Sequence, residues 1–445
     1  MSGRIGVISL GCSKNLINTE QMMYLLKNAG YHVSGEIDGA DIALLNTCGF
    51  IESAKAEAIE TILELAEAKE EGRIGKIVVA GCLPQRQKDD ILQELPEIDA
   101  IVGTGSFDDI VSVVKALTET KKKSDKPEYF GDIHAPVSET KRIITTSPIW
   151  AYLKIAEGCD NRCAYCCIPD IRGKFRSRTI ENIVQEAKEL TDRGTKELIL
   201  VAQDLTRYGL DIYSERQLPK LLEELNKIEK LKWIRLHYLY PDKITDALID
   251  VILKSDKILK YLDIPIQHIN NEILNKMHRR GTGSEIRKTI KNLREKIPNL
   301  VLRTSLITGL PGEGEEEFNE LYEFLKEAKI ERAGVFAYSP EEGTPAASMD
   351  RPPTDIAVQR AERIMQLQSQ IMQDWNNSRI GSEETVLIEN KEAFMKQKKY
   401  SLARSYAESP DVDGYILIKG KSTGDTFAKV RITGIENGEL VGERR

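Results

Sequence analysis

Cys159-Asp160-Asn161-Arg162-Cys163-Ala164-Tyr165-Cys166 is the stretch that decides how this chain is interpreted. Its spacing, Cys-x3-Cys-x2-Cys, leaves the segment one thiolate short of the four ligands that structural zinc sites and simple electron-transfer clusters usually take. A cluster held by three cysteines has one iron with a free coordination position, where a small molecule can bind. We therefore expect Cys159, Cys163 and Cys166 to hold a metal cluster that takes part in catalysis.

The composition is that of a soluble protein with several domains. The 445 residues exceed one ordinary core, and the contents of 41% hydrophobic and 30% charged residues are typical of globular proteins. We expect a cytoplasmic protein without a membrane partner, because no signal core follows Met1 and no apolar stretch approaches the ~20 residues needed to span a bilayer. Seven cysteines in that reducing compartment indicate ligation rather than disulfides. The net charge of −7 disfavours a nucleic-acid substrate, although a local basic patch could override it.

The first domain is predicted over residues 1–120, where strand and helix patterns alternate. Such alternation implies a parallel sheet covered by helices on both faces. The expected strands are residues 3–10, 41–46, 76–80 and 99–102. Residues 121–147 break this rhythm and are predicted to be a linker.

Two further domains complete the predicted α/β fold. Over residues 148–377 the alternation resumes, and six strand–helix units suggest a partial, open relative of the eight-fold (βα) barrel. Residues 378–445 carry short strands separated by glycine turns and are predicted to form a small all-β barrel. The six central strands are expected at residues 151–156, 197–202, 233–238, 261–266, 301–307 and 333–338.

A second set of cysteines follows the first three predicted strands. Cys12, Cys48 and Cys82 each lie within about two residues of a strand end. Because the carboxyl ends of neighbouring parallel strands lie side by side, the three thiols are expected to converge on a second metal site. The alternative is that each is a small buried hydrophobic residue, and three such residues at equivalent positions favour the metal site.

Polar or glycine-rich groups also end the strands of the predicted barrel. Gln203 follows the second strand, and Gly309, Gly312 and Glu313 follow the fifth. Active sites of such barrels lie at the carboxyl ends of the strands, and glycines let the backbone approach a ligand closely. A plain turn before a helix is the alternative for the glycine segment.

Basic residues and one more cysteine follow the opening segment. The basic residues could offset the charge of a cluster or bind a carboxylate, or could simply form an exposed loop. Cys167 directly follows Cys166 and is expected not to be a ligand, because adjacent side chains diverge. The basic residues are Arg172, Lys174, Arg176 and Arg178.

At these residues the sequence resembles the methylthiotransferases of the radical S-adenosylmethionine (SAM) superfamily. The segment from Cys159 to Cys166, with Tyr165 before the last cysteine, is similar to the signature of that superfamily. The resemblance covers nearly the whole chain. It implies an amino-terminal domain with three spaced cysteines, a radical SAM barrel and a carboxy-terminal TRAM-type β module.

The resemblance implies two [4Fe–4S] clusters and SAM as cofactors. Cys159, Cys163 and Cys166 would hold the cluster that cleaves SAM to a radical, and that radical would remove a hydrogen atom from the substrate. Cys12, Cys48 and Cys82 would hold the second cluster, which carries the sulfur that is methylated and transferred. A reducing donor of the flavodoxin or ferredoxin type is also implied. The residues expected to bind SAM are Tyr165, Gln203, Arg235, Gly309, Gly312 and Glu313.

The family divides by substrate into enzymes that modify an adenosine of tRNA and enzymes that modify an aspartate of ribosomal protein S-twelve. Stretches such as Leu10-Gly11-Cys12-Ser13-Lys14-Asn15-Leu16 and Ser409-Pro410-Asp411-Val412-Asp413-Gly414 resemble the ribosomal-protein branch. The predicted β module has 12 Lys or Arg and 11 Asp or Glu, hence a net charge of +1, whereas a module that grips tRNA should be basic. The acidic turn at Asp411 and Asp413 suits a cationic ribosomal protein, unless it is only a solvated loop.

We therefore expect an aspartate β-methylthiotransferase whose partner is ribosomal protein S-twelve. The tRNA-modifying enzyme of the same family is the alternative. An iron–sulfur electron carrier or zinc-binding scaffold without enzymatic activity is the hypothesis from another class.

Overall fold

The computed structural model describes residues 3–88, 90–119, 126–395, 398–420 and 424–445. Its first domain confirms the predicted parallel sheet, with the strand order β2-β1-β3-β4-β5-β6. The strands are β1 (Arg4–Ser9), β2 (His32–Ser34), β3 (Ile42–Thr47), β4 (Lys76–Gly81), β5 (Ala100–Val102) and β6 (Glu128–Tyr129). Apolar clusters lie on both faces of this sheet. The helices are α1 (Ser13–Asn28), α2 (Glu52–Glu70), α3 (Cys82–Arg86), α4 (Ile91–Glu94) and α5 (Ile110–Glu119).

Two short edge strands of this sheet were not predicted. β2 and β6 have three and two residues, which is too short for a hydrophobic period to show in the sequence. β6 lies within the predicted linker and pairs with β5, so part of that segment belongs to the first sheet.

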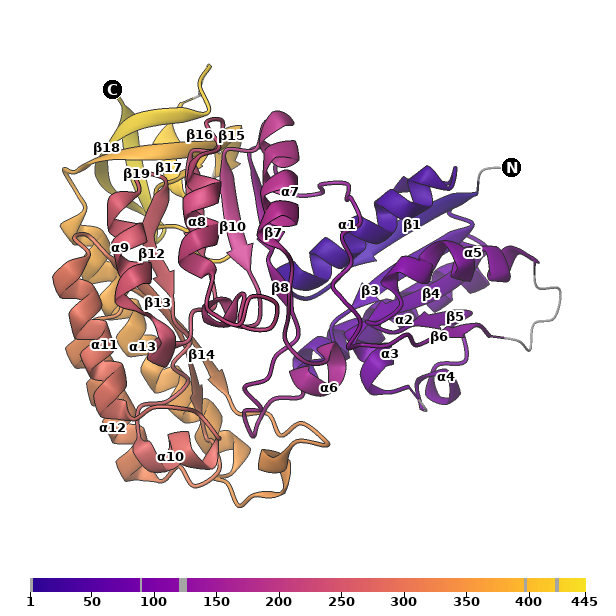
Figure 1. The fold of residues 1–445 in the computed structure, drawn as a ribbon, viewed down its shortest axis with the longest axis horizontal. Coiled ribbons are helices and arrows are strands. Elements are labelled where there is room, and N and C mark those ends of the chain that lie inside the picture. The colour runs from indigo at the N-terminus through magenta and orange to yellow at the C-terminus, as the bar shows by residue number, and fades with distance from the viewer. Residues whose placement is uncertain (1–2, 89, 120–125, 396–397, 421–423) are drawn as a thin grey trace.

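The central domain is an open six-stranded parallel sheet with the order β14-β13-β12-β11-β10-β7, as predicted for a partial barrel. Figure 1 shows its helices along one side, the first domain beside it and the β module at one end. Its main strands are β7 (Trp150–Lys154), β10 (Glu197–Val201), β11 (Trp233–Leu236), β12 (Ile258–Asp263), β13 (Val301–Thr308) and β14 (Arg332–Ala337); β8 (Ala156–Glu157) and β9 (Arg176–Ser177) form a separate pair.

The two faces of the central sheet differ in chemistry. Side chains alternate along a strand, so Leu198 and Leu200 of β10 join the core beneath the helices, whereas Ile199 and Val201 lie on the opposite, concave face. None of the described helices is long and apolar enough to cross a membrane. The helices are α6 (Ile168–Arg172), α7 (Ile180–Asp192), α8 (Leu218–Asn226), α9 (Asp246–Lys254), α10 (Asn271–Lys276), α11 (Gly283–Lys296), α12 (Glu315–Ala328) and α13 (Thr354–Ser378).

The last segment forms the predicted small β-barrel, which is closed in the order β15-β16-β17-β19-β18. Its interior is an apolar cluster that includes Val386, Ile416 and Val430. The strands are β15 (Glu383–Met395), β16 (Lys398–Arg404), β17 (Ile416–Lys419), β18 (Phe427–Glu436) and β19 (Glu439–Arg444).

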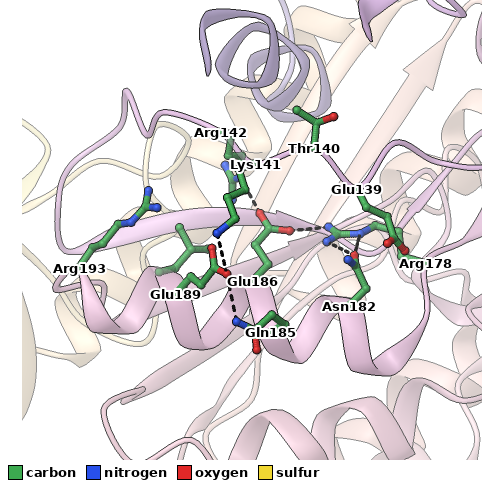
Figure 2. Close-up of a pocket in the computed structure, with 11 residues that line it drawn as sticks. Glu139, Thr140, Lys141, Arg142, Arg178, Asn182, Gln185, Glu186, Glu189 and Arg193 are labelled. Atoms are coloured by element: carbon green, nitrogen blue, oxygen red, sulfur yellow. Dashed lines mark hydrogen bonds and ion pairs between the residues drawn. The ribbon is translucent and has the colours of Figure 1, made fainter. Parts of the chain in front are cut away.

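The segment that leads into the central domain is fixed by ion pairs. Figure 2 shows Arg142 and Arg178 on either side of Glu186 of α7, at 2.7 and 2.6 Å. Burial would raise the pKa of Glu186, but the two guanidinium groups outweigh it and lower that pKa to about 2. Lys141 pairs with Glu189 one turn further along, so five of the charges that line this small pocket are already paired.

Candidate active site

Three cysteines of the opening segment lie on the loop between β8 and α6. Hydrogen bonds from Cys159 N to Gly173 O (3.1 Å) and from Ala164 N to Met277 O (3.0 Å) fix both halves of this loop to the central domain. Arg162 has a φ of 48°, which a non-glycine residue adopts only when its surroundings impose it. The loop therefore presents Cys159, Cys163 and Cys166 from a fixed backbone.

A cation and two phenols surround this loop. The sulfur of Cys163 lies 3.7 Å from the hydroxyl of Tyr240. Arg279 stacks on the Tyr240 ring at 4.3 Å and donates to the hydroxyl of Tyr165 at 3.3 Å. Burial raises the pKa of Cys159 to about 11, so a nearby positive charge such as Arg279 is what an anionic cluster would need here. Arg279 and Tyr240 were not predicted, because nothing in the local sequence links them to the cysteines.

The second set of cysteines comes from three adjacent strands. Cys12 follows β1, Cys48 follows β3 and Cys82 begins the helix after β4, and β1, β3 and β4 are neighbours in the sheet. Gly11 has a φ of 87°, and a β-carbon there would lie 2.7 Å from the β-carbon of Cys48. Only glycine permits this approach, so the structure brings the Cys12 loop directly against Cys48.

Positive charge also reaches this second set. The many protein atoms around Cys12 would raise its pKa, but Lys14 and Arg172 outweigh them and lower it. Burial and the neighbouring Cys82 raise the pKa of Cys48 to about 12. The guanidinium of Arg172 donates to the sulfur of Cys82 at 3.3 Å. Thiols with cations at hand suit an iron–sulfur cluster by their chemistry, although within the described residues no group of three or more Cys, His, Asp or Glu side chains is arranged to hold a metal ion.

Arg172 also links the two sets of cysteines. It ends α6, the helix that directly follows the loop of the first set. Its guanidinium donates to Asn15 and Asn18 of α1, at 3.1 and 2.7 Å, and pairs with Glu157 at 3.3 Å. A residue only six positions after Cys166 therefore contacts Cys82 of the second set.

The other residues that follow the opening segment take structural positions. Lys174 is exposed, Arg176 donates to the carbonyl of Ile133, and Arg178 pairs with Glu186. Cys167 is buried in the interface with the first domain, where it packs with Cys82.

Among the residues predicted to bind SAM, Gln203 offers an unpaired acceptor, whereas Gly309 and Gly312 are explained without a ligand. Gln203 donates to Glu157 at 3.1 Å, and its buried Oε1 has no hydrogen-bond partner among the described residues. Such an unpaired acceptor suits a ligand with an ammonium or hydroxyl group. Gly309, with a φ of 74°, lies so close to Ala357 that a β-carbon would collide with it. Gly312 has a φ of 84° and lies against the flexible end of the Lys276 side chain, so backbone conformation and packing account for both glycines.

Glu313 and Arg235 are engaged elsewhere. Glu313 accepts from the backbone N of Gly309 at 2.9 Å and pairs with Arg360 at 2.8 Å, which closes its own loop. The fully buried Arg235 pairs with Glu197 at 2.8 Å and donates to the carbonyl of Tyr406 in the β module. The structure therefore directs Arg235 towards the β module and does not bring it to the cysteine loop.

The acidic turn of the β module differs from its predicted role. Asp413 accepts a 2.5 Å hydrogen bond from Tyr261 and lies buried against the central sheet, so its carboxylate is not free for a cationic partner. Asp411 is exposed, 3.4 Å from the hydroxyl of Tyr152.

Comparison with known proteins assigns each domain. The radical SAM superfamily matches residues 153–325, the uncharacterized protein family UPF0004 matches residues 4–103, and the TRAM domain matches residues 380–444. A ribosomal protein uS12 methylthiotransferase RimO of Pelotomaculum thermopropionicum is 47% identical, covering 100% of this chain and 99% of that protein. The protein of the same name from Clostridium perfringens is 46% identical over 99% of this chain and 97% of its own. This chain belongs to the RimO family.

The chain is therefore a radical SAM transferase with a [4Fe–4S] cluster and SAM as cofactors. The three-cysteine loop and the unpaired oxygen of Gln203 fit that pair of groups. Among solved structures, the radical SAM methyltransferase TsrM from Kitasatospora setae shares the fold, with a TM-score of 0.58, 13% identity, and coverage of 78% of this chain and 77% of its own. Family membership supports neither the electron carrier nor the zinc scaffold.

Proposed function

We propose that this RimO-family enzyme adds a methylthio group to the β-carbon of an aspartate in ribosomal protein uS12 (S-twelve). Full-length relatives that carry this activity in their name are 43–47% identical to it. The near-neutral β module supports a protein substrate over tRNA. An enzyme with this substrate would work in the cytoplasm.

We assign the two sets of cysteines to two clusters. Cys159, Cys163 and Cys166 would hold the cluster that works with SAM, and Cys12, Cys48 and Cys82 would hold a second one. Together these groups supply the radical that removes hydrogen from an unactivated carbon and the sulfur that replaces it. The chain itself holds the first loop against the barrel, offers Gln203 Oε1 as an acceptor and places Arg279 beside Cys163.

The contact of Arg172 with Cys82 is the observation that carries this assignment. It joins the end of the first cysteine loop to a member of the second set at 3.3 Å, with Glu157 held in the same network. A reaction that needs a radical and a sulfur atom at one carbon requires its two sources to be close together. Unrelated structural metal sites would not need a shared side chain.

The test is modification of purified uS12 by the reduced, iron-reconstituted enzyme with SAM and a flavodoxin- or ferredoxin-type donor. We expect a mass gain on a single aspartate, located by fragmentation. Modification of tRNA adenosine in a parallel reaction, with uS12 unchanged, would refute the proposal.

Metal content tests the two clusters separately from activity. Two [4Fe–4S] clusters predict about eight iron and eight sulfide per chain. About four of each would leave the amino-terminal cysteines without a cluster.

A further inference from the structure

Lys14 is a buried cation without a carboxylate partner. It is the second residue of α1 and lies two positions after Cys12. Lys14 is only 6% exposed, and its ammonium nitrogen lies 3.5 Å from the ring centroid of Tyr238. Within the described part of the chain, no Asp or Glu oxygen lies within 4.0 Å of this nitrogen. Burying an ammonium group in this way is costly unless a negative partner is supplied.

The helix makes this position less favourable still. The amino end of a helix carries partial positive charge, so a cation in its first turn is repelled. The first turn of α1 contains no acidic residue that would compensate. Lys14 therefore stands where local structure alone would favour a neutral or acidic side chain.

The neighbouring cations on the concave face are paired. Lys154 lies 2.6 Å from Glu157, and Arg303 lies 3.0 Å from Asp263. Glu157 attracts Lys14 only from a longer distance, and among the described residues no carboxylate reaches ion-pair distance of it. A negative group from outside the chain would give Lys14 the ion-pair partner that Lys154 and Arg303 already have.

Lys14 also lies where the two halves of the candidate active site meet. Cys12 is on its own loop, and Tyr238 follows β11 at the carboxyl edge of the central sheet. Tyr238 has a φ of 63°, and its backbone N donates to Asp263 at 3.2 Å, so the ring that supports the ammonium is fixed. A negative group bound by Lys14 would lie beside the second set of cysteines and face the central domain.

We propose that Lys14 binds the side-chain carboxylate of the substrate aspartate and so selects an acidic residue for modification. This inference rests on the proposed function. An ionised carboxylate forms a short, charge-assisted hydrogen bond with an ammonium group, which also fixes the β-carbon one bond away. An adenosine base has no such charge. Lys14 is therefore a specificity-determining residue, whereas a cation that only balances the charge of a cluster would bind no substrate.

The experiment is a double-mutant cycle between the enzyme and its substrate. Affinity is measured for uS12 and for a uS12 variant with asparagine in place of the modified aspartate, using cluster-loaded enzyme with SAM but no reductant. Wild-type enzyme should bind the asparagine variant about tenfold to a hundredfold more weakly, the range for a hydrogen bond to a charged group. Lys14→Gln should bind both substrates equally.

Two further variants make the result decisive. Lys14→Arg keeps the charge and should retain most of the preference for aspartate. Lys27→Gln removes an exposed lysine from the other end of α1 and should behave as wild type. Iron per chain is measured for every variant. If Lys14→Gln keeps the preference for aspartate, the inference is overturned, whether or not iron is lost. Failure of the wild-type enzyme to modify uS12 would instead refute the proposed function.

Discussion

Arg172 is a single side chain that contacts both halves of the candidate active site. Its guanidinium reaches Cys82 in the first domain and Glu157 in the central domain, both at 3.3 Å. Without it, Glu157 keeps only Lys154 as an ion-pair partner, and Asn15 and Asn18 lose their donor. A buried network that loses one member leaves uncompensated charge behind.

Arg172→Ala should therefore lower the free energy of unfolding by about 3 kcal/mol, the lower end of the range for breaking a buried ion pair. The expected readouts are a lower thermal unfolding midpoint and less iron bound per chain. Lys174→Ala, which removes an exposed neighbour, is the matched control. Equal unfolding midpoints for the two variants would show that the Arg172 network does not stabilise the fold.

Substitutions in the two sets of cysteines should abolish different steps of the reaction. Cys163→Ala should abolish the cleavage of SAM to 5′-deoxyadenosine, because the radical cluster loses a ligand. Cys48→Ala should retain that cleavage and lose sulfur insertion. Both products can be measured in one reaction by mass spectrometry. Identical behaviour of the two variants would contradict the division of labour.

The sequence predicts residues well where chemistry follows from spacing or from a strand end. That rule selected the six cysteines and Gln203, whose roles stay predictions. Arg279 and Lys14 could not be assigned a role in this way, because their importance comes from contacts with residues far along the chain. Arg235 shows the opposite limit. Its strand was predicted correctly, but the sequence of a strand does not reveal which domain covers its concave face.

The connection between β16 and β17 is the element that docks the β module. Residues 405–413 lie against the central sheet, where Ser409 Oγ lies 2.9 Å from Nε2 of the buried His237, the residue directly after β11. Glu408 sits between Arg332 of β14 and Arg379 after α13, so one carboxylate joins three elements. The β module is thus held by charge as well as by the apolar contact of Trp233 with Phe427.

Glu408 should make this docking sensitive to acid. Burial would raise its pKa, but Arg379 and Arg332 outweigh burial and lower the pKa from 4.5 to about 2. A depressed pKa stabilises the fold fully above 4.5 and progressively less as the pH falls towards 2. The contribution at neutral pH is about 3 kcal/mol.

Glu408→Gln should accordingly lower the unfolding midpoint at pH 7 and flatten its decline between pH 5 and pH 2. The measurement is a series of thermal melts across that range. Glu443→Gln, in an exposed pair with Lys419, should follow the wild-type curve. A Glu408→Gln curve parallel to wild type would assign the acid sensitivity to other groups.

Prediction was weaker for elements of the β module than for the central sheet. All six central strands were found, and three of them, β7, β10 and β11, are buried along their whole length. β16 and β19 carry charged residues at their exposed positions, such as Lys398 and Lys399 of β16, so no continuous apolar run marks them in the sequence. Only closure of the barrel, a long-range event, gives those residues a buried side.

At the scale of the whole molecule, Glu341 connects the first two domains. It lies in the loop after β14. This buried carboxylate pairs with Lys55 of α2 at 3.1 Å and with Arg86 of α3 at 2.7 Å, and it accepts from the backbone N of Glu52. Figure 1 shows α3 next to α6, on the side of the first domain that faces the central one. Glu341 therefore helps to set the separation between the two sets of cysteines.

Glu341→Gln should loosen that arrangement and uncouple the two half-reactions. We expect SAM cleavage to continue while methylthio insertion falls by about tenfold or more, since small misplacements strongly slow a positioned reaction. The ratio of 5′-deoxyadenosine to modified uS12 is the measurement. Glu342→Gln, the exposed neighbour, should leave the ratio unchanged. An unchanged ratio in Glu341→Gln would show that other contacts hold the domains in place.

The buried pair of Glu197 and Arg404 has a consequence for biosynthesis. Both side chains are fully buried and lie 2.7 Å apart, although Arg404 is translated long after Glu197. The central domain emerging from the ribosome therefore has a carboxylate that only Arg235 can neutralise until the last strands are made. A prematurely terminated chain keeps that deficit and stays open to chaperones and proteases. The carboxy-terminal module thus completes the charge balance of the central domain, because Arg404 of β16 reaches Glu197 only after that strand has been translated.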